Sequence, residues 1–210
     1  TTMPAEFFSF TANVPNKDYA SLDDYDDDEI GVYRSSQWFA EELGEDAPYI
    51  LAVTQYFGYR RAAYIEIVHA DVILNDFDFI YSLDQSADTF DLPSIMLHEL
   101  GHVLGLFHQF DPEIDAVMAP TISPEEIKRS LFPDDVLAIQ TNYSHESTLQ
   151  GLAAGSSADK AKEAPSERVR GIIQLHVDGD CRHYENDRLV LRHQLKTRKF
   201  PKVPTKVGAS

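Results

Sequence analysis

The sequence contains a single cysteine, Cys181, so no disulfide bond can form within the chain. No apolar run approaches the ~20 residues that a membrane-spanning helix requires. The first residues also lack the basic start and the apolar stretch of a secretory signal peptide. We therefore expect no membrane span, and a fold stabilised by packing and by any bound metal ion.

Basic residues are few, 18 against 35 acidic ones, and they are unevenly distributed. Residues 1–159 hold 29 acidic and 6 basic side chains, whereas residues 160–210 hold 6 acidic and 12 basic ones. This asymmetry predicts that the basic tail docks on the acidic body. Nucleic-acid binding is the alternative for a basic tail, but its charges are interleaved with acids. We expect no nucleic-acid partner and a monomer.

Residues 98–108 read His-Glu-Leu-Gly-His-Val-Leu-Gly-Leu-Phe-His. In a helix, His98 and His102 lie on one face, one turn apart, where both imidazoles can reach one metal ion. Gly105 is suited to end that helix in a left-handed conformation, so that His108 can return as a third ligand. Three protein ligands with an open fourth position are typical of a catalytic zinc site.

Two further features complete this pattern. Glu99 lies beside the first histidine, placed to hold a water molecule, and Met118 lies in the later segment Asp-Ala-Val-Met-Ala-Pro at 115–120. Three histidines at this spacing, followed by a Met-turn, form the signature of the metzincin proteases. An amphipathic core helix with incidental histidines is the alternative, and the complete spacing argues against it.

The chain resembles one metzincin group, the matrixins, including their minimal bacterial members. The resemblance spans about residues 48–143 and lies in Ala-Asp-Val at 70–72, the motif at 98–108, Val-Met-Ala-Pro at 117–120 and Asp-Asp-Val-Leu-Ala-Ile-Gln at 134–140. Gln109 departs from the serine that matrixins usually have after the third histidine. The resemblance implies a secreted enzyme, in keeping with a bacterial source.

The same resemblance implies the site roles. His98, His102 and His108 bind Zn²⁺, and Glu99 acts as general base in hydrolysing protein or peptide substrates. Met118 forms an apolar floor beneath the metal. The family's acidic pair, here Asp134 and Asp135, supports the Met-turn. A non-catalytic or self-blocked zinc-binding protein of the same fold is the alternative function, and the intact Glu99 argues against it.

The expected fold class is α+β, a metzincin-like domain with a twisted mixed β-sheet, an active-site helix and a C-terminal helix. Periodicity predicts a short helix over 35–45, strands over 50–57, 63–74 and 77–83, the metal helix over 93–104 capped by Asp91 or Ser94, and a helix over 133–143. We expect an extended substrate to add to the strand edge at 77–83.

The predicted domain organisation has three parts. Residues 1–145 form the peptidase domain, 146–168 a flexible linker, and 169–210 a basic tail in which 171–177 and 189–193 pair as a hairpin.

Two ligand hypotheses concern other parts of the chain. The acidic run at 23–29 is a candidate for Ca²⁺, although its spacing fits no calcium motif, and a solvated loop is the alternative. Cys181 is a candidate latch on the open zinc position, so that removing the tail or making Cys181→Ser would raise activity. A free thiol on a loosely packed appendage is the alternative.

Overall fold

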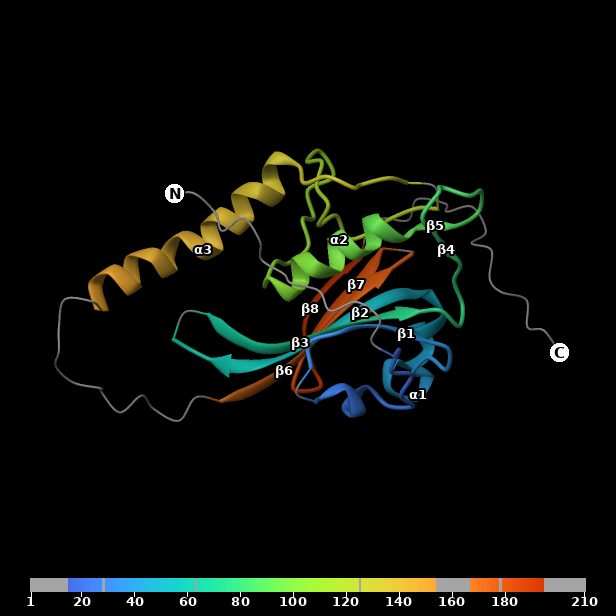
Figure 1. Cartoon of the computed structure of the whole chain (residues 1–210), viewed down its shortest axis with the longest axis horizontal. Helices are drawn as coiled ribbons and strands as arrows, with labels where there is room; N and C mark the ends of the chain where they lie inside the picture. Colours follow the sequence, from blue (N-terminus) through green and yellow to red (C-terminus); the bar gives the residue numbers. More distant parts are fainter. Residues whose placement is uncertain are drawn as a thin grey trace.

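The structure is a computed structural model that describes residues 15–27, 29–62, 64–124, 126–153, 167–177 and 179–194. It is an α+β fold built on a six-stranded mixed sheet with the order β1-β3-β2-β6-β7-β8, which confirms the expected class (Figure 1). The strands are β1 Val32–Ser35, β2 Ile50–Arg60, β3 Ile65–Asn75, β6 Arg168–His176, β7 Asp180–Glu185 and β8 Arg188–Gln194.

Strands β2 and β3 are interior strands of the sheet and pair antiparallel, while the edge strand β1 joins β3 in parallel. Both are rich in β-branched and aromatic residues, which suit a pleated surface. Their side chains are buried on both faces over most of their length, as expected for strands covered on either side. The predicted strands at 50–57 and 63–74 are confirmed, with β2 running on to Arg60.

A separate layer covers each face of the sheet. The N-terminal layer contains the 3₁₀ helix η1 Leu22–Tyr25, α1 Ala40–Leu43 and the 3₁₀ helix η2 Gly44–Tyr49. It shares a core cluster with Val53 and Ile73. Helix α2 Leu92–Val103 covers the opposite face, where Ala52 and Val72 pack against Ile95 (Figure 1). Successive side chains of β2 and β3 point to opposite faces of the sheet and thus contribute to two separate core clusters.

The expected strand over 77–83 is wrong. Only β4 Tyr81–Ser82 forms there, and it pairs with β5 Phe90–Asp91 in a separate two-stranded sheet. The chain leaves β3 in a turn in which the Asn75 side chain accepts from the backbone of Asp78 at 2.9 Å. The edges of the six-stranded sheet are therefore β1 and β8, and the substrate edge expected at 77–83 is not an edge of this sheet.

Two helices also differ from expectation. The predicted helix at 35–45 shortens to α1, because Gly44 adopts φ 76° and the chain continues as a 3₁₀ helix containing Pro48. The final helix, α3 Pro133–Ala153, is longer than the predicted 133–143 and takes up the start of the expected linker. The remainder of that linker, 154–166, lies outside the described residues. No helix in the described ranges is long and apolar enough to cross a bilayer.

Strands between residues 168 and 194 join the main sheet instead of forming a separate hairpin, and the rest of the predicted tail, 195–210, lies outside the described residues. Strand β6 pairs antiparallel with β2, and β7 lies between β6 and β8. The predicted direct pairing of 171–177 with 189–193 is therefore wrong, because the intervening residues 180–185 also form a strand.

Among the described residues, ion pairs join the start of the basic C-terminal part to the acidic body. Arg168 binds Asp26 at 2.7 Å, and Arg170 binds Asp23 at 2.8 Å. In the same acidic run, Lys17 binds Asp27 at 2.7 Å. Basic side chains of the chain itself thus pair with several carboxylates of this run, and calcium binding there stays an untested prediction.

Candidate metal centre

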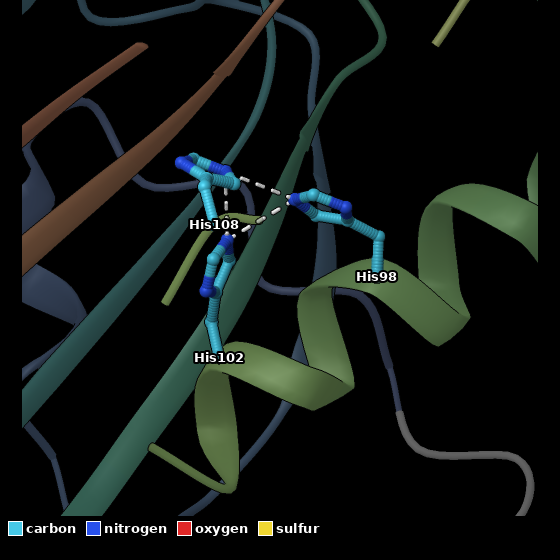
Figure 2. Close-up of side chains that lie close together, drawn as sticks. All are labelled: His98, His102 and His108. Atoms are coloured by element: carbon cyan, nitrogen blue, oxygen red, sulfur yellow. Dashed lines mark hydrogen bonds between the residues drawn. The ribbon is translucent and has the colours of Figure 1, made fainter. Parts of the chain in front are cut away.

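Helix α2 carries the first two histidines and has defined ends. Asp91 caps its start by accepting from the backbone N–H of Ser94 at 3.1 Å, and Arg129 pairs with the same carboxylate. The helix ends before Gly105, whose φ of 77° turns the chain left-handed. This turn brings His108 back over the face of α2 that carries His98 and His102 (Figure 2).

The three histidines converge on one point. The Nε2 atoms of His98 and His102 lie 3.1 Å apart, and His108 Nε2 lies 3.2 Å from the first and 3.1 Å from the second. Figure 2 shows the three rings turned toward one another from the helix and from the loop. Within the described ranges, they are the one group of side chains that could hold a metal ion.

The outer nitrogens fix the orientation of two of these rings. Nδ1 of His98 lies 2.8 Å from the carbonyl of Val117, and Nδ1 of His102 lies 2.7 Å from that of Leu106. Each Nδ1–H therefore donates outward, which leaves the Nε2 lone pairs facing inward. Tetrahedral zinc with bonds of about 2.0–2.1 Å separates its ligand nitrogens by about 3.3 Å, so this donor set fits such an ion.

The protonation of the rings also suits ligation. Burial lowers the pKa of His98 to about 4. Burial likewise holds the pKa values of His102 and His108 well below the usual range, and the neighbouring histidines add to the effect. Neutral imidazoles are the form that binds metal.

Glu99 lies on α2 next to His98 and is completely buried. Thr54 of β2 donates its hydroxyl proton to Glu99 Oε2 at 2.6 Å, while Oε1 is buried without a hydrogen-bond partner in the described part of the chain. Burial raises the pKa of Glu99 to about 8, despite the bond from Thr54. Sequence reasoning missed Thr54, because a threonine on an inward-facing strand position carries no recognisable signal.

Met118 packs against the helix that carries His98 and His102. It shares a buried cluster with Leu106 and Ile139, and a Cβ built at Gly101 would lie only 2.3 Å from its Sδ. Glycine between the two helical histidines thus allows the Met-turn to approach closely.

The two acidic residues at the start of α3 have different hydrogen-bond partners. Asp135 is buried and accepts from the backbone N–H groups of Val117 at 2.9 Å and Met118 at 3.1 Å. Asp134 instead accepts from the side chain of Gln109 at 2.8 Å. Both carboxylates therefore tie α3 to the metal centre, one through the Met-turn and the other through the loop after His108.

Cys181 lies on β7 and is buried, with its thiol donating to the carbonyl of Pro120 at 2.7 Å. The group of potential ligands found in the described ranges does not include it. The structure therefore gives no support to Cys181 as a latch on the metal, nor to the alternative of a thiol on a loose appendage, because strand pairing holds β7 in the sheet.

A histidine pair on a helix, a third histidine on the returning loop and a methionine turn below them form the arrangement that characterises the metzincin class. The sequence model of one family, described as Matrixin, matches residues 11–144. The chain belongs to the matrixin family, as its sequence motifs predicted.

Comparison with curated proteins gives plant relatives. The chain is 36% identical over 92 residues to Metalloendoproteinase 4-MMP and 35% identical over 89 residues to Metalloendoproteinase 2-MMP, both of Arabidopsis thaliana. These alignments cover 43% and 42% of this chain. Metalloendoproteinase 1 of Glycine max is 44% identical over 54 residues, or 26% of this chain.

The chain spans only part of these relatives, 26%, 22% and 17% of their respective lengths. No solved structure matches the chain.

Proposed function

We propose that this protein is a zinc-dependent endopeptidase, with His98, His102 and His108 as the zinc ligands and Glu99 as the general base. The convergence of three imidazole nitrogens carries the proposal, because lone pairs this close together repel one another and a metal ion between them would remove that repulsion. Membership of the matrixin family and the names of the metalloendoproteinase relatives support it.

When bound, zinc would supply a Lewis acid that polarises the peptide carbonyl and lowers the pKa of a water molecule toward ~7. Glu99 accepts a proton from the attacking water and returns it to the leaving amine. The hydrogen bond from Thr54 holds Oε2 and leaves Oε1 as the oxygen that takes this proton. Val117 and Leu106 keep two ligand rings in the required tautomer through their backbone carbonyls.

The decisive experiment separates metal binding from chemistry. Glu99→Gln keeps the shape of the side chain but removes the base, so we expect zinc to be retained and peptide hydrolysis to fall about 10²–10⁴-fold. Glu113→Gln, on an exposed loop, is the matched control and should cleave normally. Zinc content would be measured by metal analysis, and cleavage by digestion of an unbiased peptide library with and without a chelator.

Wild-type rates for Glu99→Gln would contradict the assignment of the base. Full activity in the presence of the chelator would contradict the whole proposal.

The alternative of a self-blocked protein has one observation in its favour. His98 and His102 are only 3% and 1% exposed, and C-terminal strands pass beside His108 (Figure 2). The same library experiment distinguishes the two functions, because a self-blocked protein would bind zinc stoichiometrically and cleave nothing. Protein or peptide substrates, a monomeric state and a secreted location follow the sequence expectations and belong to the proposal.

A further inference from the structure

We propose that the hairpin β7–β8, which lies outside the part of the chain matched by the matrixin family, positions the third metal ligand. This inference rests on the proposed function, since it assumes that His108 binds zinc. The side chains concerned are His183 of β7 and His193 of β8, which lie against two phenylalanines close to His108 in sequence.

His108 differs from the other two ligands in how it is supported. His98 and His102 are fixed by a regular helix and by hydrogen bonds from Nδ1 to backbone carbonyls. His108 lies in a loop without regular structure, and no hydrogen bond from its Nδ1 is found among the described residues. Its neighbour Gln109 is held by its N–H, which donates to the carbonyl of Met118 at 2.8 Å, and by its side chain, which donates to Asp134 at 2.8 Å, but neither bond involves the ring of His108. The orientation of the ring therefore needs another source.

Aromatic contacts with the hairpin provide that source. The ring of Phe107 lies against His183 with centroids 5.2 Å apart, and Phe110 stacks on His193 with centroids 4.1 Å apart. Phe110 also meets the edge of His108 itself, at 5.8 Å. The loop is thus held on both sides of the ligand, and the stacked Phe110 transmits the contact to the imidazole.

The hairpin is itself rigidly placed. Sheet register puts His183 opposite Ile173 of β6, and His193 opposite Cys181. His183 Nε2 lies 2.8 Å from the hydroxyl of Tyr56 on β2, and both side chains are buried.

A second attachment joins the hairpin to the Met-turn segment, where Cys181 donates to the carbonyl of Pro120. The hairpin therefore contacts both loops that complete the metal centre. An element outside the matched family region acts as a support for the site.

The test measures zinc affinity by competition with a chelator, and ligand geometry from the absorption spectrum of the cobalt(II)-loaded protein. His193→Ala removes the stack on Phe110, and we expect zinc affinity to fall about 10-fold with a changed cobalt spectrum. His193→Phe keeps an aromatic ring in place and should restore both to within about twofold. Leu189→Ala, an exposed side chain on the same strand, is the matched control and should change neither.

Phe110→Leu provides an independent variant from the other side of the contact. Because Phe110 and His193 act through one interaction, the double variant should lose little more affinity than either single variant. Thermal unfolding of each metal-free protein shows whether the variants fold.

The outcomes separate this inference from the proposed function. If His108→Ala binds zinc as tightly as the unmodified chain, the proposed function itself fails. If His108→Ala loses affinity while His193→Ala and Phe110→Leu keep both the affinity and the spectrum, only the hairpin inference is overturned. Increased peptidase activity of His193→Ala at unchanged zinc affinity would also overturn it, because the hairpin would then obstruct substrate.

Discussion

Helix α2 and the hairpin β7–β8 both bring histidines to the metal centre, but they are stabilised in different ways. On α2, the helical repeat places His98 and His102 on one face, at four residues' spacing. On the hairpin, His183 and His193 belong to no motif, and their position depends on β6 joining β2 far away in the sequence. We call α2 the local half of the site, because neighbouring residues encode it, and the hairpin β7–β8 the non-local half, because it depends on pairing between distant strands.

The two halves also have different electrostatic surroundings. The two histidines on α2 are buried, and burial lowers the pKa values of their imidazoles. The C-terminal strands are attached through buried side chains and also through charges, such as Arg182 with Asp46 at 2.5 Å and Arg168 with Asp26 at 2.7 Å. The helix should therefore respond mainly to packing changes, and the hairpin to both packing and pH.

Truncation after Ala153 gives the sharpest test of this comparison. It removes the hairpin β7–β8 together with β6 and leaves α3 intact. The lost strands bury Val169, Ile173 and Leu175 against β2. Each such side chain contributes about 1.5–3 kcal/mol, a large share of the roughly 5–15 kcal/mol that stabilises a typical domain. We expect no cooperative thermal unfolding and no peptidase activity.

The matched control for this truncation ends after Gln194, which keeps every described strand and should unfold normally. A chain truncated after Ala153 that folds and cleaves faster than the full chain would restore the idea of an inhibitory tail.

Asp135→Ala should have the next largest effect on stability, because it loosens the Met-turn that packs against α2. Its carboxylate accepts from three backbone N–H groups, those of Val117, Met118 and Phe132. Buried donors left without a partner cost about 1–3 kcal/mol each, so we expect a loss of at least ~3 kcal/mol in the free energy of unfolding. Denaturant titration measures this loss.

The neighbouring Asp134→Ala removes only the bond from a Gln109 side chain and should cost about 1 kcal/mol or less. Equal losses for the two variants would show that Asp135 is not a special support of the Met-turn.

A smaller effect is expected at Asp180, at the start of β7. Burial alone would raise the pKa of Asp180, but hydrogen bonds from Arg192 and Arg182 lower it to about 2. Because this lies below the unfolded value of ~3.9, the stabilisation is present above pH ~4 and is lost as the pH falls toward 2. Asp180→Asn should lower stability at neutral pH by on the order of 1 kcal/mol and flatten the dependence below pH ~4.

Thermal unfolding of both proteins across this pH range provides the measurement. Parallel curves for Asp180→Asn and the unmodified chain would mean that Asp180 does not anchor the hairpin electrostatically.

Cys181→Ser should have the smallest effect. A serine hydroxyl can still donate to the carbonyl of Pro120, so we expect a stability change of about 1 kcal/mol or less and an unchanged rate of hydrolysis. A rise in peptidase activity would instead mean that the thiol does reach the metal, and it would revive the latch hypothesis.

The sequence by itself determined the local half of the site. The spacing of His98, His102 and Gly105 depends only on helical geometry and on the left-handed turn that glycine permits, so α2 and its return loop follow directly from the residues. The interior strands β2 and β3 were also predictable, from their β-branched and aromatic residues. Each of these features is encoded within a few neighbouring residues.

Only the tertiary structure decided the rest. No local sequence pattern predicts that β6 pairs with β2, or that a strand at 180–185 lies between 171–177 and 189–193. Strand pairing depends on partners that are distant in sequence. The contact of Thr54 with Glu99, and the stacking of His193 on Phe110, arise only once those strands are in place. Residues 169–194 of the tail, which the sequence presented as a separate appendage, are for this physical reason part of the sheet, and their hairpin contacts the loop that carries His108.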